Sequence, residues 1–303
     1  MNRRHFLSTA AAAIPALAQK PPALTEFQLA CMTLPYSPFP FARALAGIRG
    51  AGYRYVAWGT THPDPATGAK KPLLDWREPA SRAREIAKQS RDAGLTPVMM
   101  FSMVNIEAPE GPEAHARRIE QAAAAGIPYV LTFGHTQPGK FEAAIATLKR
   151  AGPLARQAGV QVLIKQHGGN TATGVDCSRI IAEVGDEGVK MCYDAGNVLD
   201  YENHDPLTDI AQCWRDIRAF CIKDHRNHPK DEDCGPGFGE IDHYRLLAHV
   251  LRTGRAMPLA FENIFAPLVP RPKTAEGVDR LAMRSREFVE TVIEGLVSGE
   301  AKA

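Results

Sequence analysis

The sequence lacks the features that would point to several classes of function. Its 303 residues carry a formal net charge of only +2 and no basic run interleaved with aromatics, so we expect no nucleic-acid partner. The six cysteines form no CxxC pair, which argues against a zinc or disulfide framework. No GxGxxG follows the first strand-like run, and after the N-terminus no segment is apolar enough to span a bilayer. We therefore expect no stable membrane insertion once an N-terminal signal is removed.

The first eighteen residues differ from the rest of the chain. Arg3 and Arg4 precede a short apolar run, and Ala16-Leu17-Ala18 has the small-x-small pattern of a cleavage site. This pattern is typical of a twin-arginine export signal, and the alternative is a basic, Ala-rich helix. We predict a signal peptide over 1–18, a linker over 19–26, and an exported, periplasmic protein.

From residue 27 onward, short apolar runs alternate with amphipathic segments of helical period. The strand-like runs are Phe27–Leu34, Tyr53–Trp58, Thr96–Ser102, Tyr129–Phe133, Gln161–Lys165, Val189–Tyr193, Ile217–Lys223 and Met257–Phe261. The helical segments are Phe41–Arg49, Pro79–Asp92, Glu113–Ala125, Phe141–Gln157, Cys177–Val184, Pro206–Arg215, His243–Arg252 and Val278–Gly295.

Eight such units in one chain predict a single α/β domain over 27–303, a (β/α)8 TIM barrel, with an open doubly wound sheet as the main competitor. Glycines that suit helix C-caps follow several helices (Gly52, Gly94, Gly126, Gly159, Gly185 and Gly254). Longer insertions follow the second, sixth, seventh and eighth strands, over 62–78, 198–205, 225–241 and 264–273. In a barrel these βα loops build the active face, so we expect a pocket at the carboxyl ends of the strands.

Charged residues end four successive predicted strands: Lys165, Asp194, Lys223-Asp224-His225 and Glu262. Carboxylates, lysines and imidazoles that converge at one rim suit proton transfer at sugar carbons or a divalent ion. Each also has a structural interpretation. Asp194 suits a helix N-cap, and Lys165 could be a buried ion-pair partner of Asp194 or Glu262.

Four strings carry a resemblance to a known family: Tyr193-Asp194-Ala195-Gly196-Asn197, Ile222-Lys223-Asp224, Gly237-Phe238-Gly239-Glu240-Ile241-Asp242 and Phe261-Glu262. Together they resemble the xylose-isomerase-like TIM-barrel sugar (phosphate) isomerase/epimerase family. The resemblance implies a divalent cation that grips adjacent oxygens of a hydroxyketone, and two carboxylates that move a proton through an enediolate.

The resemblance also implies a metal shell of Glu, Asp, His and Glu, one each from strands five to eight. Asp194 and Glu262 match this shell, but Lys165 stands in place of the first Glu and Cys221 in place of the His. The chain therefore resembles a divergent branch. Three ways to fill the site remain open. His167 or His225 could complete a metal site, or Lys165 could polarise a keto oxygen without a metal. Lys165 could also act as a base if burial lowers its pKa.

We predict an isomerase or epimerase that abstracts a proton next to the carbonyl of a sugar or keto-sugar, its small-molecule partner. Glu262 and Lys165 are the expected catalytic residues. Asp194, Glu262 and His167 are expected to hold a divalent metal (Mn, Co, Zn, Fe or Mg). His167, Asn197, Lys223 and His225 are expected to bind substrate. The alternatives are a keto-glycoside lyase acting by β-elimination and a sugar-binding protein without catalysis. A homo-oligomer is compatible with the sequence.

Overall fold

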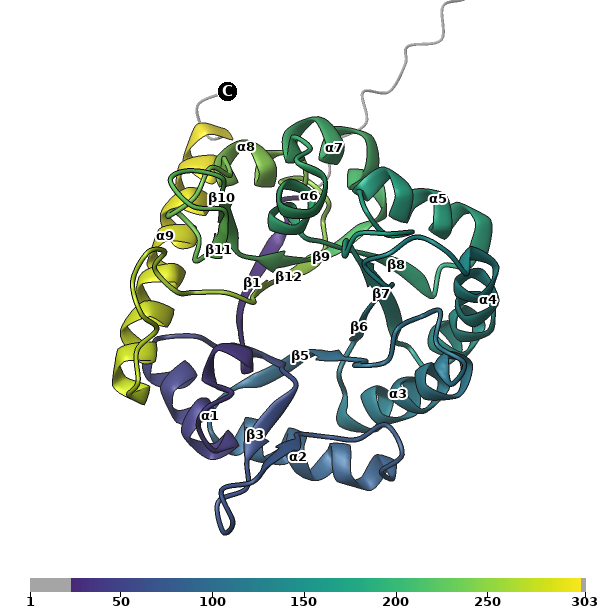
Figure 1. Cartoon of the computed structure of the whole chain (residues 1–303), viewed down its shortest axis with the longest axis horizontal. Helices are drawn as coiled ribbons and strands as arrows, with labels where there is room; N and C mark the ends of the chain where they lie inside the picture. Colours follow the sequence, from purple (N-terminus) through teal and green to yellow (C-terminus); the bar gives the residue numbers. More distant parts are fainter. Residues whose placement is uncertain (1–22, 301–303) are drawn as a thin grey trace, which may run out of the picture.

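The computed structural model describes residues 23–300, so the predicted signal peptide over 1–18 lies outside the described residues. Eight parallel strands close into a barrel in the order β1-β12-β9-β8-β7-β6-β5-β2, and helices surround them as an outer ring (Figure 1). The predicted single (β/α)8 barrel is confirmed.

All eight predicted barrel strands are present, with ends shifted by a few residues at most. They are β1 (Glu26–Met32), β2 (Tyr55–Trp58), β5 (Thr96–Phe101), β6 (Tyr129–Phe133), β7 (Gln161–Lys165), β8 (Val189–Tyr193), β9 (Ile217–Ile222) and β12 (Ala256–Phe261). The helices are α1 (Phe41–Gly50), α2 (Ala80–Asp92), α3 (Gly111–Ala125), α4 (Phe141–Gln157), α5 (Gly174–Val184), α6 (Ala195–Glu202), α7 (Pro206–Cys213), α8 (His243–Ala248) and α9 (Ala275–Glu300).

Three of the long βα insertions contain regular structure. The insertion after β2 forms the hairpin of β3 (Thr61–Pro63) and β4 (Lys70–Pro72), and the one after β9 forms the hairpin of β10 (Asp224–Arg226) and β11 (Glu232–Cys234). The segment over 198–205, expected as a loop, is mostly the extra helix α6. Asp194 starts this helix because its side chain accepts a hydrogen bond from the backbone N–H of Asn197.

The sequences of the strands are continuous apolar runs because both faces of each strand are buried. One face packs against the helices, and the other fills the barrel interior. The interior set is Met32, Ala57, Met99, Phe101, Leu131, Leu163, Cys192, Ala219, Cys221 and Ala260. All six cysteines are free and buried, so they pack as small apolar residues of the core.

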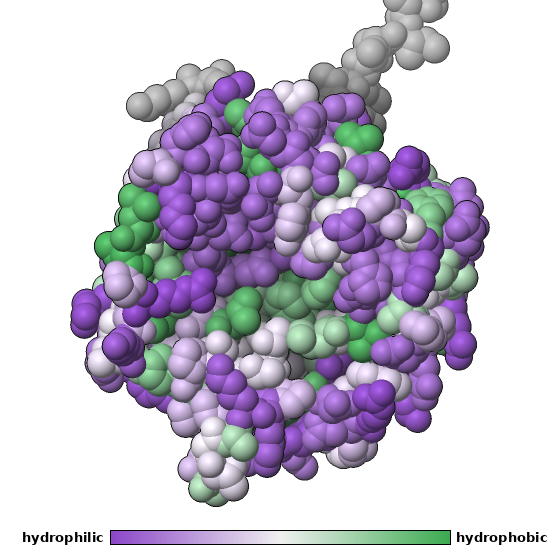
Figure 2. All heavy atoms as spheres, in the orientation of Figure 1, coloured by the Kyte–Doolittle hydropathy of each residue, from purple (hydrophilic) through white to green (hydrophobic). Residues whose placement is uncertain are grey.

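Seen from the side of the βα insertions, the surface is hollowed near the barrel axis (Figure 2). Hydrophilic residues crowd the side of this hollow near the β10–β11 hairpin, and less polar residues line the opposite side (Figures 1 and 2). No helix within residues 23–300 combines the length and apolar character needed to cross a membrane.

A buried histidine joins α3 to the barrel. His115 is fully buried, with its ring nitrogens 2.7 Å from the Gly111 carbonyl oxygen and 2.7 Å from Thr132 Oγ1. Burial lowers the pKa of His115 from 6.5 to about 4. The unfolded chain therefore takes up a proton at a higher pH than the folded chain does.

We expect this histidine to make the protein less stable as the pH falls from about 6.5 to 4, by up to about 3 kcal/mol. His115→Phe should cost about 1–3 kcal/mol at pH 7, because Thr132 and Gly111 lose their partner, but it should remove this part of the pH dependence. Urea unfolding at several pH values measures both effects. The control is His249→Gln, at an exposed position, in which the free energy of unfolding should depend on pH as it does in the wild-type protein. An unchanged slope in His115→Phe would contradict the assignment.

Candidate active site at the carboxyl ends of the strands

Four charged side chains enter the barrel mouth because each lies two positions beyond an inward-facing core residue. Side chains alternate between the two faces of a strand, so position i+2 continues the face of position i. Lys165 continues the face of Leu163 in this way. The other pairs are Cys192 with Asp194, Cys221 with Lys223, and Ala260 with Glu262.

The ammonium group of Lys165 lies between two carboxylates. Its Nζ is 3.0 and 2.8 Å from the two oxygens of Glu262, and 2.9 Å from Asp194 Oδ2. Lys165 and Asp194 are buried, whereas the Glu262 side chain is 16% exposed. The structure thus brings together the three residues predicted to form the centre, and Glu262 is the one that reaches the solvent.

Burial and the neighbouring charges shift the pKa values of these groups in opposite directions. Burial alone would lower the pKa of Lys165, but Asp194 and Glu262 outweigh it and raise that pKa well above its usual value. Burial would raise the pKa of Glu262, but Lys165 and Lys223 lower it to about 2. Full burial raises the pKa of Asp194, and the two lysines offset this only in part. Lys165 is therefore a fixed cation at neutral pH and Glu262 a fixed anion.

Asp194 caps α6 and also pairs with Lys165, as the structural interpretations of these two residues predicted. Its Oδ1 accepts a hydrogen bond from the Asn197 backbone N–H at 3.0 Å, which caps α6, while its Oδ2 faces Lys165. Its own N–H donates to Gln166 Oε1 at 2.7 Å. Gln166 also accepts a bond from the Asn197 amide at its carbonyl oxygen, at 2.6 Å. The cap and this clamp fix the carboxylate in place.

Lys223 forms a second positive group beside the first. Its Nζ donates to Asn197 Oδ1 and to Asp233 Oδ2 at 2.7 Å, and it lies 4.0 Å from Asp194 Oδ2. The side chain passes over the first turn of α6, where a Cβ on Gly196 would lie 2.6 Å from its Cε. Glycine is needed at that position because any larger residue would displace Lys223.

His225 lies on the β10–β11 hairpin among three carboxylates. Its ring nitrogens are 3.2 Å from Asp233, 3.4 Å from Asp231 and 3.9 Å from Asp200. Burial would lower the pKa of His225, but these carboxylates outweigh it and raise that pKa. Asp233 therefore links His225 to Lys223. Sequence analysis missed Asp233, because nothing in the run Asp231-Glu232-Asp233 marks which carboxylate points inward.

His167 lies close enough to Lys165 for the charge of the lysine to affect its ring. Its Nδ1 is 3.1 Å from the Gly134 carbonyl oxygen, so this nitrogen carries the proton and Nε2 is the acceptor. Burial and the charge of Lys165 lower the pKa of His167, which keeps the ring neutral. Phe133 and Tyr201 contact the ring at centroid distances of 4.5 and 5.6 Å. These three rings form an aromatic wall beside the charged centre.

A cavity of about 230 Å³ opens above the charged centre. Glu262, Lys223 and Asp233 line it on the polar side, and Leu34, Pro35 and Phe265 on the apolar side. A cavity with apolar walls and a few convergent charged groups is the usual form of a small-molecule site.

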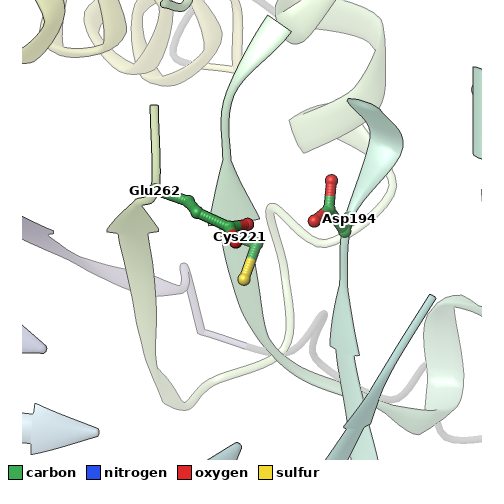
Figure 3. Close-up of side chains that lie close together, drawn as sticks. All are labelled: Asp194, Cys221 and Glu262. Atoms are coloured by element: carbon green, nitrogen blue, oxygen red, sulfur yellow. The ribbon is translucent and has the colours of Figure 1, made fainter. Parts of the chain in front are cut away.

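Carboxylates are common ligands of divalent metal ions, and this centre contains two of them. Within residues 23–300, Asp194, Cys221 and Glu262 offer ligand atoms within 4.8 Å of one another, and in Figure 3 their side chains converge from neighbouring strands. Lys165 Nζ, however, already lies within 3.0 Å of both carboxylates, where a cation would bind them. Burial raises the pKa of Cys221, which keeps it a thiol.

These residues do not fit a divalent ion while Lys165 is charged, because the ammonium and the ion would compete for the same oxygens. His167 is not among the three convergent ligands, and its Nδ1 contacts Gly134 instead. The predicted metal site of Asp194, Glu262 and His167 is untested, and the contacts of Lys165 and His167 argue against it.

Lys165→Met should lower the free energy of unfolding by about 3–5 kcal/mol at pH 7, because it leaves two buried carboxylates without their cation. Chemical denaturation measures this loss. Lys149→Met removes an exposed lysine that pairs with Glu183 at 3.0 Å, and we expect it to cost less than about 1 kcal/mol. Equal small losses in the two variants would contradict a buried, charged Lys165.

Comparison with solved structures supports the architecture. L-Ribulose 3-epimerase has a TM-score of 0.68 at 18% identity, over 90% of this chain and 96% of that one. A xylose isomerase-like TIM barrel protein from Mycobacterium smegmatis, in complex with magnesium, also has a TM-score of 0.68 at 18% identity. The match covers 89% of this chain and 97% of that one. D-Allulose 3-epimerase from Methylomonas sp., in complex with D-allulose, has a TM-score of 0.64 at 16% identity. The match covers 90% of this chain and 99% of that one.

At these identities the likeness shows a shared fold. No curated protein matches the chain significantly in sequence. The family model described as xylose isomerase-like TIM barrel matches residues 45–283, which is most of the chain and includes β7 to β12 with the charged centre. The chain belongs to the xylose isomerase-like TIM-barrel family.

Proposed function

We propose that the chain is an enzyme that moves a proton at the carbon next to the carbonyl of a sugar or keto-sugar, so that isomerisation or epimerisation results. The observation that carries this proposal is the ammonium of Lys165, held between Asp194 and Glu262 at the mouth of the barrel. Sugar epimerases among the structural neighbours share the same architecture.

Lys165 and Lys223 supply the electrophile. Removing a proton next to a carbonyl puts negative charge on the carbonyl oxygen, and positive groups fixed beforehand in a buried site stabilise that charge strongly. Both side chains are almost fully buried, and their carboxylate partners raise the pKa of each. This favours Lys165 as a hydrogen-bond donor to the substrate oxygen over Lys165 as a base.

Glu262 is the proposed base because its carboxylate lines the cavity. In the resting site both of its oxygens bind Lys165, which holds its pKa at about 2 and makes it a weak base. A substrate oxygen that accepts a hydrogen bond from Lys165 Nζ would displace Glu262 and let its pKa rise. Substrate binding would thus activate the base at the moment when the electrophile is engaged.

The remaining groups would position the sugar. The neutral His167 offers Nε2 as an acceptor for a hydroxyl, and the aromatic wall of His167, Phe133 and Tyr201 suits the apolar face of a sugar ring. Lys223, together with Asn197 and His225 behind it, would bind the oxygens at the other end.

Wild-type protein incubated with a panel of ketoses and keto-glycosides in D₂O should exchange the proton next to the carbonyl, as followed by NMR. We expect Glu262→Gln to slow this exchange by about 10²- to 10⁴-fold, since it removes the base. Glu183→Gln, on the outer surface, should leave the rate unchanged. Exchange accompanied by loss of the aglycone would instead assign β-elimination, as in a keto-glycoside lyase. Sugar binding without any exchange would refute catalysis.

The effect of chelation on the exchange rate distinguishes an ammonium electrophile from a metal-ion electrophile. Because Lys165 lies between the two carboxylates, we expect the exchange rate to be the same before and after dialysis against EDTA. Elemental analysis of the purified protein should find less than one equivalent of Mn, Fe, Co or Zn. A rate that falls at least tenfold on chelation and recovers with one added metal would assign the site to that metal.

A further inference from the structure

A second cavity lies next to the one above the charged centre. It measures about 420 Å³ and lies between the loop that follows β12 and the N-terminal part of α9. Phe265 and Arg271 line both cavities, so the two adjoin at these side chains. A molecule whose reacting carbon lies near Glu262 could therefore extend past Arg271 into the second cavity.

The charged residues that line this second cavity all carry the same sign. Arg271, Lys273 and Arg280 line it, and no Asp or Glu does. Within residues 23–300, none of the three forms an ion pair or hydrogen bond with a carboxylate. Glu276 lies one turn before Arg280 on α9, but its carboxylate is bound by Arg43 at 3.2 Å. Glu276 is the acidic group that interacts with Arg280, and it is shared with Arg43, so the three cations still produce a net positive potential that a ligand can neutralise.

Two further features favour an anion at this place. The guanidinium of Arg271 stacks over the Phe265 ring at 4.5 Å, which orients it at the junction of the two cavities. Thr274 and Gly277 in the cavity wall belong to the start of α9, where Thr274 Oγ1 accepts from the Gly277 N–H at 3.2 Å. The N-terminal end of a helix carries a partial positive charge, which adds to the charge of the three side chains.

We propose that this second cavity binds an anionic substituent of the substrate, a phosphate or a carboxylate, while the sugar carbonyl lies at Lys165 and Glu262. This inference rests on the proposed function and narrows its substrate class to acidic sugars. The walls between the cations are apolar, with Phe265, Pro270 and Leu281 among them, so the charged side chains provide the main polar contacts for the substituent.

Calorimetric binding tests this inference without requiring turnover. The probes are inorganic phosphate, D-fructose, D-fructose 6-phosphate and D-glucuronate. We expect inorganic phosphate to bind, and to bind more weakly as the salt concentration rises. At least one acidic sugar should bind at least tenfold more tightly than D-fructose. A preference for D-fructose 6-phosphate assigns a phosphate, and a preference for D-glucuronate assigns a carboxylate.

The matched variants carry the same change of net charge. Arg271→Gln/Arg280→Gln should weaken the binding of phosphate and of the preferred acidic sugar at least tenfold. Arg84→Gln/Arg150→Gln, on the exposed faces of α2 and α4, should change it less than twofold. Equal weakening in both pairs, or no preference for an acidic sugar over D-fructose, would overturn the inference. Glu262→Gln should still bind phosphate, so failure of proton exchange and failure of this site can be told apart.

Discussion

The buried ammonium of Lys165 and the carboxylates of Asp194 and Glu262 stabilise one another, and each would be costly to bury alone. Three strands of a closed barrel deliver these groups to one point, because each extends the inward face of its strand by two positions. The cap of α6, the Gln166 clamp on Asp194 and the glycine beneath Lys223 all maintain this arrangement. The site is therefore part of the packing of the barrel.

The same arrangement shapes the chemistry that the site can perform. In the reaction that we propose, the cation between the two carboxylates would donate to an oxygen that becomes negative, and it would hold Glu262 as a weak base until the substrate competes for it. One of the structural neighbours was solved with magnesium. In this chain Lys165 lies between the two carboxylates, so family membership gives the fold, and the electrophile that we propose comes from the chain's own residues.

Much of this could be predicted from the sequence. The alternation of apolar runs and helical segments was enough to predict the barrel, because each strand is buried on both faces and each helix on one. Lys165, Asp194 and Glu262 were found because charges directly after buried strands are rare in a barrel. Helix α6 was missed although Asp194 was a candidate cap, because its eight residues are too few for a helical period to be recognised in the sequence. Gln166 and Asp233 were missed as well, because their roles depend on contacts between segments that sequence spacing does not encode.

The charge state of Lys165 is the most direct test of this account. In protein labelled with ¹⁵N at the lysine Nζ, NMR should show, besides any signal from the buried Lys223, an ammonium signal that is protected from solvent exchange, that persists above pH 10 and that is absent from Lys165→Met. That result would agree with a cation held by Asp194 and Glu262. A Lys165 amine that loses its proton near pH 7 would contradict the account, since the two carboxylates would then not stabilise a positive charge between them.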